Sequence, residues 1–314
     1  MVAYLIRRAI MMVATLLVSS FVVFAGLWAA PGNPLATLSG GRSLPPEAVA
    51  VLVERYRLDD PFFVQYANWL ANAVRGDLGM SITLRQDVSD LIVSRAGTTL
   101  SLIVYAALIV LVVGVAFGLL AALRPGFFDS MVVVCTAMVV AVPPFVAAIV
   151  LIGIFAVTLR WLPALGNGTG FWDSVRHLTL PAFALAASAT AAVARVTRTS
   201  VREQMGREHV QTAVSRGIPY ATVVRRHALR NAAVPIATLA GMTVASMIAL
   251  SAVVERAFGL NGLGAYLVTS ALSKDFSVVQ GIALVLVTAF VLVNTLVDVG
   301  AAMLDPRIKL GGRS

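Results

Sequence analysis

Three histidines and one cysteine are the side chains of this sequence best suited to metal binding or nucleophilic chemistry, and their spacing supports neither role. His177, His209 and His227 do not stand at metal-ligand spacing with carboxylates or with Cys135. The apolar runs contain no Ser-His-Asp or paired-carboxylate pattern, and no G-x-x-x-x-G-K-[ST] loop for nucleotide phosphates occurs. We therefore expect a protein that is not an enzyme, with no metal site, no cofactor and no ATP site of its own.

One ionisable residue, Asp298, lies inside a long apolar run. It follows Asn294 by four positions, so both side chains share one helical face. An ionisable residue in a membrane span is a functional candidate by default, and we keep Asn294 and Asp298 as candidate pathway residues. A proton relay would usually need further buried acids, and we expect none in the other spans. Because Asp298 lies close to Asp305 and the basic end of the sequence, we expect it to pair with an arginine near the membrane surface.

The composition is that of a polytopic membrane protein. Hydrophobic residues make up 59% of the sequence and charged residues 12%, with a mean hydropathy of +0.89, whereas a soluble domain carries about 25% charged residues. The net charge of +9 does not indicate nucleic-acid binding, because long apolar runs separate the basic residues and prevent a continuous basic surface. We therefore expect the partners of most of the surface to be membrane lipids.

Six runs without Asp, Glu, Lys or Arg are apolar enough to cross the bilayer, which takes about 20 residues. They are 9–30, 96–123, 130–159, 177–194, 231–254 and 276–297. A seventh apolar run, 257–273, is rich in glycine in its first half, so we interpret it as a short re-entrant or surface segment. The first run is long for the core of a cleaved signal peptide, and we expect it to be retained as a span.

The distribution of charged residues predicts which side of the membrane each loop faces. With six spans both termini lie on one side, where the loops and tails carry 14 cations and four acids, against ten of each on the other side. Cation-rich loops stay in the cytoplasm, so we expect both termini to be cytoplasmic. The expected organisation is a tail and first span (1–30), an extracytoplasmic loop (31–95), a five-helix core (96–303) and a cytoplasmic tail (304–314). The core contains the expected cytoplasmic coupling loop, 199–231.

Two consecutive prolines, Pro143 and Pro144, interrupt the third run near its middle. A proline pair removes two backbone donors, which predicts a kinked or discontinuous span. An ordinary packing kink explains the pair, and so does a bend that lines a transport pathway, so both prolines remain pathway or gating candidates.

The cytoplasmic loop reads "REHVQTAVSRGIPYATVVRRHALRNAAVP" at 207–235. Glu203 and Arg207 are spaced for a helical i,i+4 pair. Gly217 suits the left-handed conformation that ends a helix, and Pro219 can open the next one. The loop is therefore predicted to be helix, turn, helix, held by spans at both ends. Such an element suits the docking of a partner, although a basic helix lying on anionic lipid fits the same pattern.

This loop resembles that of the inner-membrane permease subunits of ABC importers, specifically the B-type subunit of the dipeptide/oligopeptide/nickel family. The superfamily has an E-A-A-x-x-x-G core; here "QTAVSRG" (211–217) matches at Ala213 and Gly217 and departs at the first two positions, like the peptide-family variant. Other segments follow in family order over nearly the whole chain. They include "PGNP", "LDDPFFVQYANWLANAVRGDLGMSI", "VPPF", "WLPALG", "HLTLPAFALA", "VERAFGLNGLGAYLV" and "LVDVGAAMLDPRIK".

The resemblance implies an all-α integral membrane protein with a type I ABC importer permease-like fold in the bacterial inner membrane. It implies a second, homologous permease subunit, two cytoplasmic ATPase domains that bind ATP and Mg, and an extracytoplasmic substrate-binding protein. ATP-driven import of di- or oligopeptides is the expected function, with this chain forming half of an alternating-access pathway. The residues expected to couple the chain to the ATPases are Glu208, Thr212, Ala213, Gly217, Arg225, Arg226, His227, Arg230 and Asn231.

Two alternatives remain open. The same fold can import nickel chelates, haem or another small solute, because the binding protein largely sets specificity. An ion-coupled secondary transporter or channel belongs to a different class, and the lack of several ionisable residues inside the spans argues against it.

Overall fold

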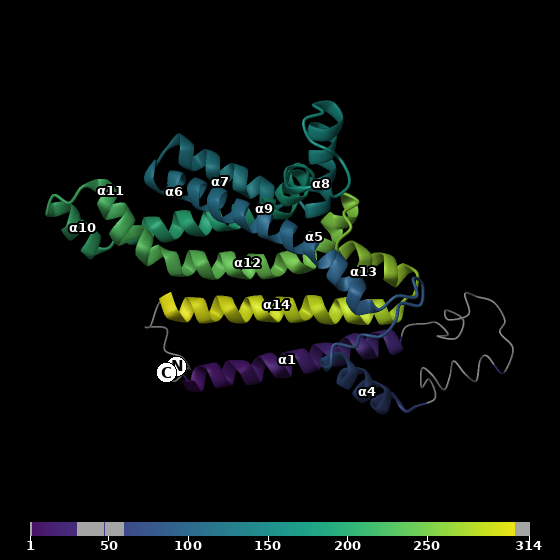
Figure 1. Ribbon diagram of the computed structural model, residues 1–314. Helices are drawn as coiled ribbons and strands as arrows, with labels where there is room; N and C mark the ends of the chain where they lie inside the picture. Colours follow the sequence, from purple (N-terminus) through teal and green to yellow (C-terminus); the bar gives the residue numbers. More distant parts are fainter. Residues whose placement is uncertain (1, 30–46, 48–59, 305–314) are drawn as a thin grey trace.

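Long apolar helices make up most of the structure (Figure 1). The computed structural model describes residues 2–29, 47 and 60–304 of the chain. Within them, five helices are long and apolar enough to cross a membrane, and one bent helix pair makes a sixth crossing if it counts as one span. The helices are α1 (Val2–Trp28), α4 (Phe62–Val74), α5 (Val88–Ile109), α6 (Val115–Leu123), α7 (Phe127–Val140), α8 (Pro144–Leu151), α9 (Phe171–Met205), α10 (Glu208–Ser215), α11 (Tyr220–Val223), α12 (Arg230–Ala257), α13 (Leu263–Leu272) and α14 (Phe276–Leu304), with π-helical turns η1 (Val110–Gly114), η2 (Ile152–Thr158) and η3 (Val224–Leu229).

The proline pair breaks the third predicted span. α7 ends at Val140, Pro144 is the first residue of α8, and the two helices meet at 104°. Neither proline can donate a backbone hydrogen bond to the preceding turn, so the helical ladder cannot continue through them. The predicted discontinuity is confirmed. The prediction for 257–273 is confirmed as well, because α13 has 10 residues and is too short to cross a bilayer.

Several spans extend beyond their predicted boundaries. The second span begins at Val88 instead of residue 96, and α9 covers 171–205 instead of 177–194. The prediction ended each span at its nearest charged residue, whereas these helices continue past the apolar core with Asp173 in the first turn of α9 and Arg202 in its last. Charged residues at helix ends leave the hydrocarbon and still continue the helix.

Helix α9 lies at the centre of the bundle and packs against α5, α6, α7, α8 and α12. Gly114 and Gly118, a G-x-x-x-G pair, face it. A Cβ on Gly114 would lie 3.1 Å from the carbonyl oxygen of Thr190, and one on Gly118 would lie 2.6 Å from that of Ala194. Small residues at this spacing let two helices approach closely in a membrane.

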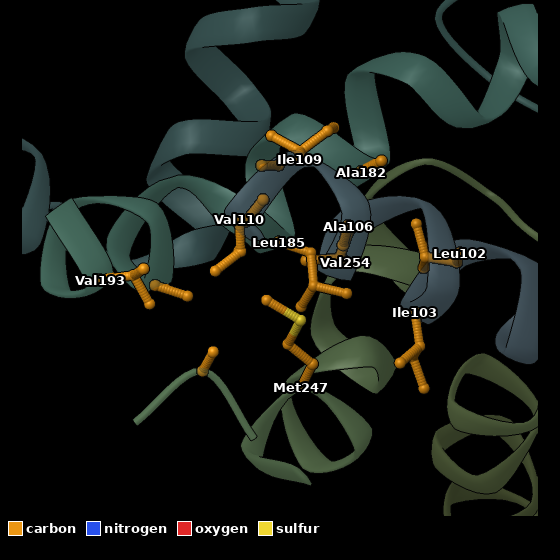
Figure 2. Packing of buried hydrophobic residues seen from close by; sticks show 14 of the residues in the cluster. Leu102, Ile103, Ala106, Ile109, Val110, Ala182, Leu185, Val193, Met247 and Val254 are labelled. Carbon is orange, nitrogen blue, oxygen red and sulfur yellow. The ribbon is translucent and has the colours of Figure 1, made fainter. Parts of the chain in front are cut away.

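The main hydrophobic core lies between α5, α9 and α12. Figure 2 shows side chains of these helices, with η1, gathered in one cluster. Leu102 and Ala106 come from α5, Leu185 from α9, and Met247 and Val254 from α12, and each is at most 1% exposed.

Helix α1 lies at the edge of the bundle, against α14 and α4. Aromatic side chains join it to α4: Phe24 contacts the rings of Phe62, Tyr66 and Trp69 at centroid distances of 5.5 Å. Figure 1 shows α10 and α11 at the end of the bundle where α1 begins and α14 ends, with α4 and α13 at the opposite end.

Candidate functional site

A helical element projects from one end of the bundle (Figure 1). It comprises α10, α11 and η3, residues 208–229, and we call it the α10–α11 element. α10 ends in a tight turn at Gly217, where φ is +72°. The backbone amide of Gly217 donates to Val214 O at 2.9 Å and that of Ile218 donates to Ala213 O at 3.2 Å. Pro219 then precedes α11, as predicted.

Position 217 requires glycine because of its backbone conformation and not because neighbouring atoms crowd it. A Cβ there would have no heavy atom within 4 Å, so space is available for a side chain. The positive φ is the constraint, because an L-residue pays about 1–2 kcal/mol to adopt it. The predicted left-handed conformation at Gly217 is confirmed.

The element has a small hydrophobic core of its own. Val210, Ala213 and Val223 are at most 5% exposed, and Met205 and Ile218 pack against them. The expectation that Ala213 faces a docking partner is therefore corrected, because Ala213 is buried within its own chain. Its small size lets α10 pack closely against α11.

The outer surface of the element is exposed and mostly basic. Glu208, Thr212, Arg225, Arg226 and Arg230, all predicted coupling residues, are exposed. Among the described residues none of these three arginines forms an ion pair, whereas the nearby Arg207 pairs with Glu203 as its spacing predicted. The surface therefore offers cationic groups that can bind acidic or polar partners.

Asn231, in the first turn of α12, and His227 link the element to that helix. The Asn231 amide donates to His227 O at 2.8 Å and lies 3.3 Å from His209 Nε2. These contacts join α10 to the start of α12. The element is therefore connected to α12, the span that follows it.

A second polar cluster lies where α7 begins and α9 ends. The Asp129 carboxylate accepts from Arg198 Nη2 at 2.9 Å and lies 2.9 Å from Arg202 Nη2, with 14% of its side chain exposed. This cluster, which the sequence reasoning did not identify, joins the end of α9 to α7 of the bent span. The i,i+4 spacing of the two arginines was the available signal.

The four predicted pathway residues lie in different parts of the bundle. Pro143 and Pro144 join α7 to α8, which pack against α9. Asn294 donates to Phe290 O of its own helix at 3.1 Å. Asp298 forms an ion pair with Arg8 of α1, which confirms the expected arginine partner.

Two buried carboxylates lie at the opposite end of the bundle, and the sequence reasoning overlooked both. Glu255, in the last turn of α12, is 0% exposed, and Asp275, before α14, is 1% exposed. The expectation that Asp298 is the sole acid inside a span is therefore wrong. The run without charged residues ends at residue 254, one position before Glu255, whereas α12 continues to Ala257 and includes Glu255.

Comparison with known families gives matches over nearly all of the chain. The family described as "Binding-protein-dependent transport system inner membrane component" matches residues 114–310, and the N-terminal family of the same membrane component matches residues 1–103. Together the two matches include the described helices except residues 104–113 of the second span.

Three bacterial permeases are similar over 98% of this chain. An oligopeptide transport system permease, AppB of Bacillus subtilis, is 34% identical and is covered over 100% of its length. The glutathione transport system permease GsiC of Escherichia coli is 34% identical and covered over 99%. The dipeptide transport system permease DppB of Alkalihalophilus pseudofirmus is 31% identical and covered over 100%.

A solved structure shares the fold. The MetNI methionine ABC transporter in an inward-facing conformation contains a chain that matches with a TM-score of 0.55 at 18% identity. The match covers 68% of this chain and 96% of that one. The helical architecture is thus that of an ABC importer permease.

Proposed function

Because this chain belongs to the family of inner membrane components of binding-protein-dependent transport systems, we propose that it is a permease subunit of an ATP-driven peptide importer. It is a multi-pass protein of the bacterial inner membrane. It is a transport subunit and not an enzyme, and ATP hydrolysis belongs to separate subunits. ATPase and substrate-binding partners are general features of such importers.

The finer partner composition is part of the proposal. A second, homologous permease subunit completes the pathway, and two cytoplasmic ATPase domains bind ATP and Mg. An extracytoplasmic binding protein delivers the substrate. The exposed basic surface of the α10–α11 element, hydrogen-bonded to the start of α12, is the observation that carries the assignment of this element as the ATPase coupling site.

The coupling site has two kinds of residue. Glu208, Thr212, Arg225, Arg226 and Arg230 are exposed and are the contacts to the ATPase. The buried Ala213 and the turn residue Gly217 set the shape of the element, and His227 and Asn231 link it to α12. The basic composition and position at one end of the bundle support a cytoplasmic location for this element and for both chain termini.

Short peptides are the proposed substrates. The similar permeases named above serve oligopeptides, dipeptides and glutathione, which is itself a tripeptide. Import of nickel chelates, haem or another small solute by the same fold remains the alternative within the class.

The test is uptake by the complex reconstituted in vesicles with its second permease, ATPases and binding protein. We expect uptake of a radiolabelled tripeptide that requires ATP on the ATPase side and persists when ion gradients are collapsed. Uptake of a nickel–histidine chelate and not of peptide would replace the substrate class. Uptake that follows a proton or sodium gradient without ATP would contradict the proposed function.

A further inference from the structure

The N-terminus of α13 is held by side chains from two other helices. The backbone amide of Leu263 donates to Thr99 Oγ1 of α5 at 2.8 Å, and that of Ala265 donates to Glu255 Oε2 of α12 at 2.9 Å. Thr99 Oγ1 in turn donates to Glu255 Oε1 at 2.7 Å. A helix normally caps its first amides with a residue of its own, whereas here the caps come from α5 and α12.

This three-helix junction is closed to solvent. Glu255 is 0% exposed and Thr99 is 4% exposed. Among the described residues no cation forms an ion pair with Glu255, so its compensation comes from hydrogen-bond donors and from the positive end of the α13 dipole. A buried carboxylate that lost these donors would be strongly destabilised.

Two glycines let the junction form. A Cβ on Gly262 would lie 2.7 Å from Glu255 Oε1, and a Cβ on Gly264 would lie 2.7 Å from the backbone nitrogen of Ala252. Only glycine allows α13 to begin so close to α12. Gly262 and Gly264 are among the glycines that make 257–273 a poor spanning helix. The structure shows that they allow α13 to pack closely against α12.

Further contacts fix α13 along its length. The Arg95 guanidinium of α5 lies 4.0 Å from the centroid of the Tyr266 ring. After α13, the Asp275 carboxylate accepts from Ser81 Oγ at 2.6 Å and from the backbone amide of Thr83 at 3.1 Å. Thus α13 is attached at both ends, and the attachment to α12 is made by Glu255.

Helix α12 connects this junction to the α10–α11 element. Its 28 residues correspond to about 42 Å of helix. Asn231 and His227 hold the element to its first turn, and Glu255 lies in its last. One continuous helix therefore joins the proposed ATPase coupling site to α13.

We propose that Glu255 is a positioning residue for transport: with Thr99 it fixes α13 to α12 and α5, so that a movement of α12 at the α10–α11 element displaces α13 at the extracytoplasmic end. The proposal rests on the proposed function. Without the junction, α12 still moves when ATP binds, but α13 no longer follows it. ATP is then hydrolysed with less peptide transported per ATP.

The first test compares variants of nearly unchanged shape in the reconstituted complex. Thr99→Val removes the hydroxyl that bonds both Leu263 N and Glu255, whereas Thr99→Ser keeps it. We expect Thr99→Val and Glu255→Gln to lower the peptide taken up per ATP hydrolysed by about tenfold, since each leaves buried polar groups without partners. Thr99→Ser should restore the parental ratio. Thr288→Val is the control, because the Thr288 hydroxyl bonds only Leu284 O of its own helix among the described residues.

A parental ratio of uptake to hydrolysis in both Thr99→Val and Glu255→Gln overturns the proposal. So does an equal loss of uptake and hydrolysis, which is the result expected from a purely structural role. Failure of the proposed function looks different, because the parental complex itself then takes up no peptide.

The second test does not depend on the identity of the substrate. Ser273→Cys is placed at the exposed end of α13 in a Cys135→Ala background, and its reaction rate with a membrane-impermeant maleimide is measured without nucleotide and after trapping with ATP and vanadate. We expect the rate to differ between the two states in the parental sequence and to be equal in both states with Thr99→Val. Equal rates in the parental sequence would show that α13 does not move, and would overturn the proposal.

Discussion

At the scale of single residues, side-chain size controls how closely the helices pack. Gly118 lies on α6 where α9 crosses it, and a Cβ there would overlap the side chain of Thr197 and the carbonyl of Ala194. Gly97, in α5, has no heavy atom within 4 Å of the position of a Cβ. Both glycines lie in helices, but only Gly97 has space for an added methyl group.

This difference gives a matched pair of variants. Gly118→Ala should lower the free energy of unfolding by about 1–3 kcal/mol, because the added methyl group forces α6 away from α9. Gly97→Ala should be neutral or should stabilise by up to about 1 kcal/mol, because alanine has the higher helix propensity. Thermal unfolding of both purified variants in detergent measures the effect, and an equal midpoint for the two would contradict this account of the packing.

The residue scale also shows the limit of reasoning from sequence. The arginine partner of Asp298 was predicted from proximity to the basic end of the chain, but its identity, Arg8, depends on α1 packing against α14. Glu255 was overlooked because a carboxylate beside an apolar run looks the same in sequence whether it faces water or a helix N-terminus. The donors that stabilise it lie 156 and 10 residues away.

At the scale of elements, the α10–α11 element was predicted well in its local structure and less well in its orientation. The turn at Gly217 and the helix start after Pro219 follow from backbone preferences, which act locally. The burial of Ala213 does not, because a small residue suits both a docking surface and a close helix contact. In the structure Ala213 packs with Val223 in a small hydrophobic core, so it makes a close helix contact.

The turn provides the prediction at this scale. Gly217→Ala should reduce binding-protein-stimulated ATPase activity, because an L-residue at φ +72° costs about 1–2 kcal/mol or rotates the following helix with its arginines. Gly206→Ala, at the other end of α10, should have little effect, because Gly206 has a φ of −81° and ordinary space for a Cβ. Stimulated hydrolysis and peptide uptake in vesicles are the measurements. Normal coupling in Gly217→Ala would favour the interpretation that the element lies on the lipid surface.

At the scale of the whole molecule, the spans were predictable because hydropathy is averaged over many residues. All six predicted apolar runs correspond to long helices or to the bent pair. The order of the helices in space was not predictable, because lipid-facing and core-facing surfaces are both apolar in a membrane protein. That α9 is central and α1 peripheral follows only from the packing.

Orientation across the membrane is testable with single cysteines in a Cys135→Ala background. Because cation-rich loops stay inside, we expect Gln86→Cys to react with an impermeant maleimide in intact cells. Ser215→Cys, in the exposed part of α10, should react only after the cells are permeabilised. Labelling of position 215 but not of position 86 in intact cells would reverse the proposed topology.

The contact between α1 and α14 has a consequence for biosynthesis. The ribosome makes α1 first and α14 last, so at about 5–20 residues per second α1 waits roughly 12–55 seconds for its main partner. During that interval it can pack against α4, whose aromatic rings surround Phe24. Its apolar surface remains against lipid meanwhile, and much of that surface is still exposed in the finished bundle. The Arg8–Asp298 ion pair can then form only when synthesis is nearly complete.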